Sequence, residues 1–454
     1  MKNSFTRLKT LSKYLSKYLS KYLSKYLSKY FCKYKFYSIL GLGTALVMLS
    51  FKFLFALPAY GQETVTINIL MNALEASQWQ PFVPQFEAEN PGIDLNIIEG
   101  PNATNLIEDL YTSAFLLGDS PYDLVYMDTV WAPKFAAAGW LQPLDDRIPK
   151  AELNQFLPGD IEAGRYQDQL YRIPVRSDVG MLYYRTDLLA EGGYNPPETF
   201  EELQTIAANL QENSPADWGY LWQGKQYEGL SAMFVEVLKG YGGFWIDPAT
   251  NTVGLDRANA IDAVKFLTAT IDTGITPKGV TTYTENETLR FFINGESVFL
   301  RNWPYVWREA NKDDSPIAGK IALKPMVHAP KYNSGGCQGG WGLGISSTTA
   351  YTEEAWKVIQ YFSSEEFQRQ FVLSTSYVPS RRSLFTDPQI VAEYGHYPEL
   401  LSVLDNAVLR PPVAQYAQAS DILQRYLTAA LSGRLTPEDA MQSAAAETRR
   451  LLGQ

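Results

Sequence analysis

Apolar strand-like runs alternate with helical stretches from residue 65 onward, and this alternation limits the folds open to the chain. Strand patterns occupy residues 65–71, 93–98 and 123–128, and helical spacing occupies residues 78–89 and 104–117. Strands that alternate with helices are typical of α/β proteins with a mostly parallel sheet, in which ligands bind beyond the carboxyl ends of the strands. The third strand pattern ends at Asp128, so we expect this carboxylate at the ligand-binding edge.

A second βα region begins near Pro174. It contains Asp178, a compact strand at residues 181–184 and a helix from Phe200 with Thr199 as its N-cap. Further helices are expected at residues 229–239, 257–271, 288–294, 353–362, 365–374, 421–431 and 437–452. The fold class predicted for the whole body is therefore α/β.

Residues 1–61 differ sharply from the rest of the chain, with 11 basic side chains and no acidic one. An apolar run at residues 39–57, broken only by Lys52, is followed by Ala59-Tyr60-Gly61, which is the pattern of an export signal with a cleavage site. The alternative is an uncleaved membrane anchor, since the run approaches the length that spans a bilayer. The same leader carries a tandem Leu-Ser-Lys-Tyr repeat at residues 11–30, either an interface-seeking cationic helix or an expanded repeat under little constraint.

The remaining 393 residues carry 28 basic and 49 acidic side chains, a net charge of 28 − 49 = −21. Such a body is not expected to bind nucleic acid or an anionic membrane. This body is long enough for two domains. The whole chain contains 46% hydrophobic residues, which argues against disorder. We expect an exported, periplasmic, monomeric protein, tethered to the membrane if the leader is not cleaved.

Cysteine and histidine are too scarce for several kinds of site. Cys337 is the single cysteine after the leader, and His328 and His396 are the two histidines of the chain. A four-ligand zinc site of cysteines and histidines cannot be assembled from them, and neither histidine lies in a HExxH pattern. The sequence contains no GxSxG nucleophile elbow and no GxxxxGK[ST] phosphate loop. We therefore expect no metal, no cofactor and no catalytic triad.

Tryptophan is concentrated in the acidic body, which holds all 10 of these residues. Several lie beside glycine, proline or polar residues and suggest aromatic loops, at residues 218–227, 302–307 and 339–342. Aromatic rings cover the apolar faces of a sugar, while carboxylates and guanidinium groups bind its hydroxyls. Each tryptophan alone is better explained by packing, but the three segments together favour a sugar-binding protein.

Seven longer motifs resemble the extracellular solute-binding proteins of carbohydrate ABC importers, in particular the trehalose/maltose-binding group. They are YDLVYMDTVW (122–131), GWLQPLDD (139–146), LYRIPVRSDVGMLYYRTDLL (170–189), WGYLWQGKQYEGL (218–230), RNWPYVW (301–307), GGWGLGIS (339–346) and NAVLRPPV (406–413). The resemblance extends from Val65 to Leu452. It implies two α/β lobes that close like a hinge around a small sugar, which is then delivered to a transmembrane permease driven by an ATPase.

The resemblance also implies lobe boundaries and hinge segments. The N-terminal lobe would comprise residues 62–174 and 342–380, and the C-terminal lobe residues 175–341 and 381–454. The hinge is expected where the chain crosses between lobes, near residues 173–177, 340–345 and 378–383.

Individual site residues follow from the same resemblance. Asp128 and Asp178, on opposite lobes, would accept hydrogen bonds from sugar hydroxyls, and Arg410 would donate to them. Trp303 and Tyr305 would stack on the sugar or form its wall, and Trp341 would close the far side. Glycine backbone can approach a ligand closely, which is the role implied for Gly339 and Gly340. Glu75, after the first strand, is a further candidate.

The pocket departs from the usual pattern of the trehalose/maltose-binding group at three positions. Arg176 replaces a sugar-contacting tyrosine, Ile107 replaces an arginine, and Asn102 replaces a threonine. Because donors have moved within the pocket, we expect a ligand other than trehalose or maltose, such as sucrose or the compatible solute glucosylglycerol.

Two other functional classes fit parts of the sequence. A secreted glycoside hydrolase needs two carboxylates about 5 to 10 Å apart, and Asp128 and Asp178 could supply them. A peptide- or metal-binding protein of the same architecture is disfavoured by the scarce histidine and cysteine and by the tryptophan-rich segments. Because nothing else in the sequence favours hydrolysis, we expect a binding protein and no enzyme.

Overall fold

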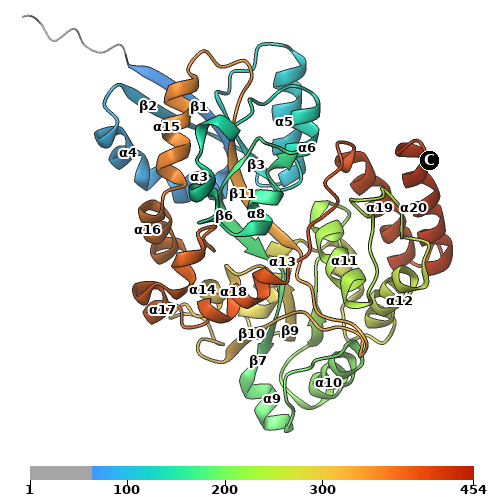
Figure 1. Cartoon of the computed structure of the whole chain (residues 1–454). Helices are drawn as coiled ribbons and strands as arrows, with labels where there is room; N and C mark the ends of the chain where they lie inside the picture. Colours follow the sequence, from blue (N-terminus) through green and yellow to red (C-terminus); the bar gives the residue numbers. More distant parts are fainter. Residues whose placement is uncertain (1–63) are drawn as a thin grey trace, which may run out of the picture. The chain divides into compact units, whose positions relative to one another are not determined.

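The computed structural model describes residues 64–454, so the leader, its repeat and the expected cleavage site lie outside the described residues. The described residues form two α/β lobes, each with its own β-sheet and surrounding helices (Figure 1). The predicted α/β, two-lobed fold is confirmed.

The first lobe is built on a five-stranded sheet with the order β2-β1-β3-β11-β6. Its strands are β1 (Val65–Asn72), β2 (Ile93–Gly100), β3 (Leu124–Asp128), β6 (Ile173–Val179) and β11 (Gln338–Ile345). Strand β1 runs parallel to β2 and β3, whereas β11 is antiparallel to both β3 and β6. The sheet is therefore mixed rather than mostly parallel. A separate short hairpin joins β4 (Arg165–Tyr166) and β5 (Gln169–Leu170).

The second lobe is built on a four-stranded sheet with the order β10-β7-β9-β8. Its strands are β7 (Met181–Arg185), β8 (Trp218–Leu221), β9 (Ser297–Asn302) and β10 (Ile321–Lys324). Only the pair β8 and β9 is parallel. The aromatic loop expected at residues 339–342 was wrong, because it lies inside β11. The loop expected at residues 218–227 was wrong in part, because residues 218–221 form β8.

Each helix expected from the sequence has a counterpart in the structure, whereas seven helices among the described residues were not expected, at residues 132–137, 150–153, 158–162, 186–192, 306–310, 388–393 and 397–405. Helices of both kinds cover the two sheets. They are α3 (Ala73–Trp79), α4 (Val83–Glu89), α5 (Thr104–Leu116), α6 (Ala132–Ala137), α7 (Lys150–Leu153), α8 (Pro158–Glu162), α9 (Thr186–Gly192), α10 (Phe200–Asn213), α11 (Glu228–Gly240), α12 (Ala258–Asp272), α13 (Glu285–Ile293), α14 (Val306–Ala310), α15 (Thr352–Phe362), α16 (Glu365–Thr375), α17 (Pro388–Glu393), α18 (Tyr397–Asp405), α19 (Tyr416–Leu431) and α20 (Pro437–Leu451). Thr199 is the N-cap of α10, as predicted, and the structure adds a reciprocal capping box with Glu202.

The helix expected at residues 78–89 is divided. Helix α3 ends at Trp79, a 3₁₀ turn occupies Gln80–Phe82, and α4 begins at Val83. Pro81 and Pro84 each lack an amide hydrogen, so a continuous ladder of helical hydrogen bonds cannot pass through them.

The chain passes between the sheets at β6 and β7, which are separated only by Gly180. A third segment runs beside β6, where the Ser177 amide donates to Val378 O at 2.9 Å and the Ser380 hydroxyl donates to Pro174 O at 3.1 Å. The three segments expected to form the hinge therefore lie next to one another, because β11 also pairs with β6.

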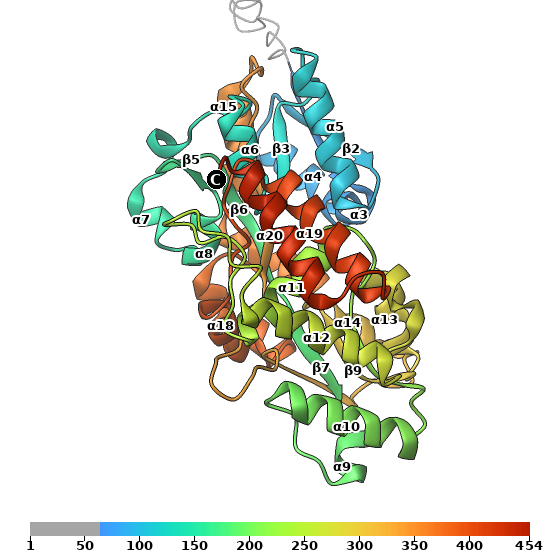
Figure 2. The same cartoon turned by 90° about the vertical axis from the view of Figure 1, so that its right-hand side faces the viewer.

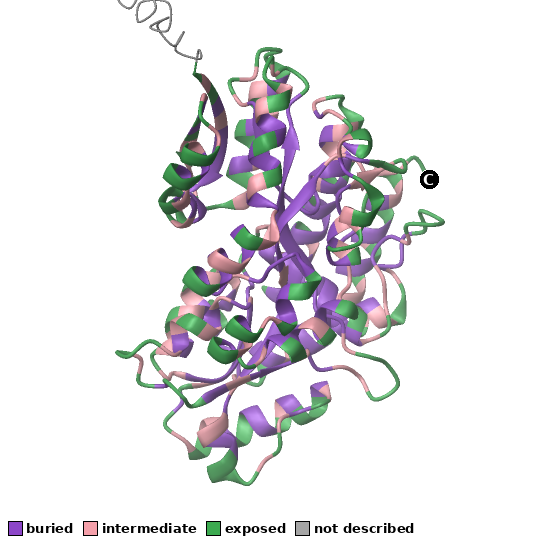
Figure 3. Cartoon of the chain, turned by 60° about the vertical axis from the view of Figure 1, so that its left-hand side comes forward, coloured by how far each residue is buried: buried purple, intermediate pink, exposed green. Residues whose placement is uncertain are grey.

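Burial follows the two sheets. Figure 3 shows buried strands through the centre of both lobes and exposed surfaces on the outer helices. Both strand β3 and strand β11 are buried along their whole length. Within residues 64–454 no helix combines the length and apolar character needed to cross a bilayer.

Candidate functional site

Polar and aromatic side chains gather around β11, at the junction of the two lobes. In the register of the first sheet, Asp128 on β3 lies opposite Trp341, and Asp178 on β6 lies opposite Gly339. The two aspartates therefore flank one strand. The expectation that they stand on opposite lobes was wrong, because β3 and β6 belong to the same sheet.

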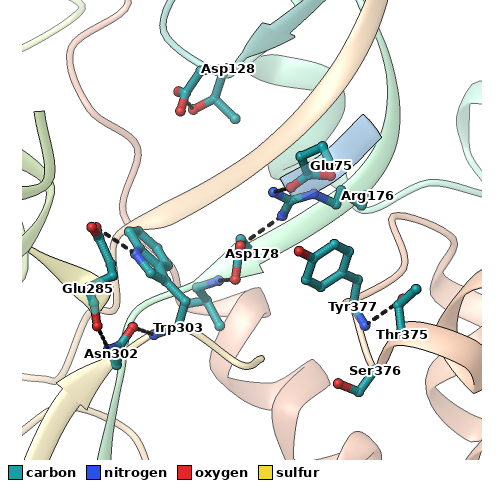
Figure 4. A network of polar contacts seen from close by, with 12 residues as sticks. Glu75, Asp128, Arg176, Asp178, Glu285, Asn302, Trp303, Thr375, Ser376 and Tyr377 are labelled. Carbon is teal, nitrogen blue, oxygen red and sulfur yellow. Dashed lines mark hydrogen bonds and ion pairs between the residues drawn. The ribbon is translucent and has the colours of Figure 1, made fainter. Parts of the chain in front are cut away.

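Arg176 connects two of the predicted carboxylates. Its Nη1 donates to Asp178 Oδ2 at 2.9 Å and its Nη2 donates to Glu75 Oε1 at 2.6 Å (Figure 4). The other oxygen of Glu75 accepts from the Tyr126 hydroxyl at 2.9 Å. The guanidinium also lies 4.8 Å from the ring centre of Tyr377, within cation–π range.

Burial and charge act on this cluster in opposite directions. Burial alone would lower the pKa of Arg176, but the carboxylates of Glu75 and Asp178 raise it well above its usual value. Burial raises the pKa of Asp178 to about 6, even though Arg176 opposes that shift. Arg176 is therefore a permanent cation, while Asp178 changes its charge in a range close to neutral pH.

Arg410 makes a second cluster of similar design. Its Nη2 donates to Asp128 Oδ1 at 2.6 Å and to the Thr129 hydroxyl at 2.9 Å, and its Nη1 donates to Glu228 Oε1 at 2.6 Å. Only 3% of the Arg410 side chain is exposed. In this structure the guanidinium that was expected to donate to the ligand is held by two protein carboxylates.

Trp303 is fixed on two sides, and its indole stands near Asp178 (Figure 4). The indole nitrogen donates to Glu285 Oε1 at 3.2 Å, and the Arg301 guanidinium lies 4.3 Å from the ring centre. A Cβ atom added to Gly339 would come within 3.3 Å of the indole and 3.2 Å of Asp178 Cβ. Glycine at this position therefore lets Trp303 approach the sheet.

Tyr305 and Trp341 differ in their surroundings. Tyr305 is half-buried directly before α14, two residues after Trp303. Trp341 is only 7% exposed, stacks on Tyr126 with ring centres 4.8 Å apart, and meets the edge of Trp131 at 5.4 Å. Trp341 is thus packed against two aromatic side chains of the first lobe.

Gly340 has a positive φ of 121°, a backbone conformation that side chains rarely adopt. A Cβ atom there would meet Arg176 O at 2.8 Å. In the described structure, residue 340 must therefore be glycine because β11 and β6 approach each other closely at this point.

Asn102 is not part of either arginine cluster. Its side chain is exposed and accepts a hydrogen bond from the Leu74 amide at 3.0 Å. Ile107, the other departure on this side, is fully buried in the core. The next residue, Glu108, pairs with Lys134 at 2.7 Å, and burial raises the pKa of its carboxyl.

Sequence reasoning missed three side chains of this region: Glu228, Glu285 and Tyr377. Glu228 lies at the start of α11, inside the quoted motif at residues 218–230, so its motif position was an available signal. Glu285 follows Thr284, which forms a capping box with Glu287 at the start of α13. Tyr377 follows α16 and had no local signal, because its partner Arg176 is distant in sequence.

Comparisons with known proteins agree with this architecture. Residues 72–369 match the family described as bacterial extracellular solute-binding protein. A probable ABC transporter-binding protein of Deinococcus radiodurans is 30% identical over 374 residues, covering 81% of this chain and 88% of the relative. A maltotriose-binding protein of Pyrococcus abyssi is 25% identical over 334 residues, covering 73% of this chain and 69% of the relative.

Among solved structures, maltose-bound MalE3 of T. maritima is 34% identical and superposes with a TM-score of 0.81. It aligns over 86% of this chain and 100% of its own. The family match spans more than half of the chain, and the solved structure shares its architecture. The chain therefore belongs to the family of bacterial extracellular solute-binding proteins.

Proposed function

We propose that residues 64–454 bind a small, uncharged sugar at the junction of the two lobes and deliver it to the permease of an ABC importer. The observation that carries this proposal is the fixed indole of Trp303 beside the carboxylate of Asp178. An indole face covers the C–H surface of a sugar, and an ionised carboxylate is a strong acceptor for its hydroxyls. Tyr305, Gly339, Gly340 and Trp341 complete the proposed binding surface.

The charges around this region favour an uncharged ligand. The five carboxylates are Glu75, Asp128, Asp178, Glu228 and Glu285. Four of them accept hydrogen bonds from Arg176 or Arg410, and Glu285 accepts from Trp303. An anionic sugar would meet net negative charge, which opposes binding. The names of the maltotriose-binding relative and the maltose-bound structure agree with a neutral sugar.

The identity of the sugar is proposed from the three departures in the pocket. Arg176 occupies a position where a tyrosine is usual, Ile107 removes a donor, and Asn102 bonds to the protein backbone. These changes favour sucrose or glucosylglycerol over trehalose or maltose.

Isothermal titration with these four sugars tests the proposal, using protein from which bound ligand has been removed by unfolding and refolding. We expect the lowest Kd for sucrose or glucosylglycerol. Tightest binding of maltose would refute the assignment while leaving the sugar-binding role intact. Mass spectrometry of the ligand that co-purifies with the native protein gives an independent answer.

The titration should be accompanied by a test for hydrolysis. The protein is incubated with each disaccharide and released glucose is measured, with Asp178→Asn as the comparison. Because both aspartates are bonded to arginines, we expect binding without turnover. Glucose release that disappears in the variant would favour the glycoside hydrolase.

The cellular context is proposed on the same basis. The protein would be exported, have its leader removed near residue 61, act as a monomer, and meet the permease and its ATPase at the membrane. Because β6 and β11 belong to the first sheet, the divisions expected at residues 174/175 and 341/342 would move to about residues 180 and 337, while the third would stay at residues 380/381. N-terminal sequencing of the mature protein and light scattering of the purified body test the cleavage site and the oligomeric state.

A further inference from the structure

Arg410 stands between the two lobes, and each of its terminal nitrogens is bonded to a different lobe. Asp128 is the last residue of β3 in the first sheet, and Glu228 is the first residue of α11. Helix α11 is fixed to the second sheet, because its Glu236 accepts from Arg301 Nε of β9 at 2.8 Å. Figure 2 shows α11, α19 and α20 lying together in the second lobe.

The position of Arg410 depends on its carboxylate partners. Residue 410 lies in a segment between α18 and α19 that belongs to no helix or strand. Glu228 is itself fixed, because it accepts from the hydroxyls of Tyr416 and Ser420 on α19, the latter at 2.6 Å. The Arg410 guanidinium is thus tied to a rigid part of the second lobe through Glu228.

The three charged side chains are largely shielded from water. The exposed fractions are 3% for Arg410, 11% for Asp128 and 12% for Glu228. Ion pairs in such surroundings interact more strongly than exposed pairs, and breaking one leaves a poorly solvated charge. Separating the lobes along this line requires one of the two pairs to break.

We propose that Glu228 is a positioning residue that holds Arg410 in an ionic latch to Asp128 and so favours the closed arrangement of the lobes. The inference rests on the proposed function in one respect, that the same closure surrounds the sugar. Without the Glu228 charge, Arg410 can move away with Asp128 when the lobes separate. The latch therefore raises the closed population before any sugar binds.

Spin labels on the two lobes measure this population directly. Asp109 on α5 and Gln226 before α11 are both exposed, and each can be replaced by cysteine for labelling. In protein that lacks residues 1–61, Cys337 is the single native cysteine, and burial raises the pKa of its thiol to about 12, so it does not compete for the label. Pulsed electron resonance then gives the distribution of distances between the labels in the absence of sugar.

We expect Glu228→Gln to shift that distribution toward longer distances, and Glu228→Ala to shift it further. Glutamine keeps an acceptor for Arg410 and can donate to the Tyr416 and Ser420 hydroxyls, so it preserves folding while removing the charge. Glu447→Gln is the matched control. Glu447 also accepts from an arginine and a tyrosine, Arg425 at 2.7 Å and Tyr426 at 3.0 Å, but these lie on α19.

Identical sugar-free distributions in wild type and Glu228→Gln would overturn the latch, as would an equal shift in Glu447→Gln. Sugar affinity gives a second readout, since Kd should rise by the factor by which the closed fraction falls. If no sugar binds the wild type, the proposed function fails, whereas the sugar-free distances still decide on the latch.

Discussion

At the scale of single residues, the site is a set of charged side chains that pair with one another. Arg176 and Arg410 each lie between two carboxylates, and Trp303 donates to Glu285. Arg176 and Asp178 are two residues apart, but the other arginine partners are distant in sequence, up to 282 positions for Arg410 and Asp128. The sequence motifs identified the individual residues, but no local pattern shows which arginine pairs with which carboxylate.

Replacing Trp303 with alanine should weaken sugar binding by about 1–3 kcal/mol, because the ligand loses the aromatic face that it covers. Titration calorimetry measures the change. Trp140→Ala is the control, because Trp140 stacks on Phe115 with ring centres 5.3 Å apart within the first lobe. The control should lower stability without changing Kd, and full affinity in Trp303→Ala would refute the stacking role.

Sugar binding should weaken on acidification, because burial raises the pKa of Asp178 to about 6. Above that pH the carboxylate accepts hydroxyl donors and pairs with Arg176, and below it the protonated group does neither as well. We expect Kd to rise as the pH falls from about 8 to about 5, with a pH dependence that corresponds to the uptake of about one proton. Asp178→Asn should bind less tightly and lose this dependence, and an equal slope in both proteins would assign the proton to another group.

At the scale of elements, β11 was the main feature that the sequence did not predict. Four of its eight residues are glycine, which is depleted in strands, and residues 339–342 were expected to form a loop. The strand exists because β3 and β6 pair with it on both sides. Elements with local signals were predicted well, as the N-cap Thr199 shows for α10.

Replacing Gly340 with alanine should destabilise the protein more than the same change at Gly433. Both glycines have positive φ angles, 121° and 70°, which alanine adopts less readily than glycine. Both variants should therefore be destabilised by backbone strain. Only at residue 340 would the new Cβ meet backbone, at 2.8 Å from Arg176 O, whereas nothing lies within 4 Å at residue 433. We expect losses of roughly 1–3 kcal/mol for Gly340→Ala and under about 1 kcal/mol for Gly433→Ala, measured by denaturant unfolding.

At the scale of the whole molecule, two sheets share a junction crossed by β6 and β7, with β11 and the segment near Val378 beside it. The alternation of strands and helices was sufficient to predict the α/β class. It could not predict that Asp128 and Asp178 share a sheet, because sheet order depends on pairing between distant segments.

Saturating sugar should reduce the radius of gyration measured by small-angle X-ray scattering, because the ligand binds the closed pair of lobes more tightly than the open pair. The Trp303→Ala variant, at a sugar concentration that leaves it unoccupied, serves as the control. An unchanged radius in sugar-saturated wild type would argue against hinge closure.

The position of β11 has a consequence for how the protein is made. This strand joins β3 to β6, yet residues 180–337 separate it from β6 along the chain. During synthesis the first lobe cannot complete its sheet until residue 345 has left the ribosome. The nascent chain therefore stays incompletely folded through most of its translation. An incompletely folded chain can still pass through a membrane channel. The order of the strands itself thus delays the completion of this sheet until late in synthesis.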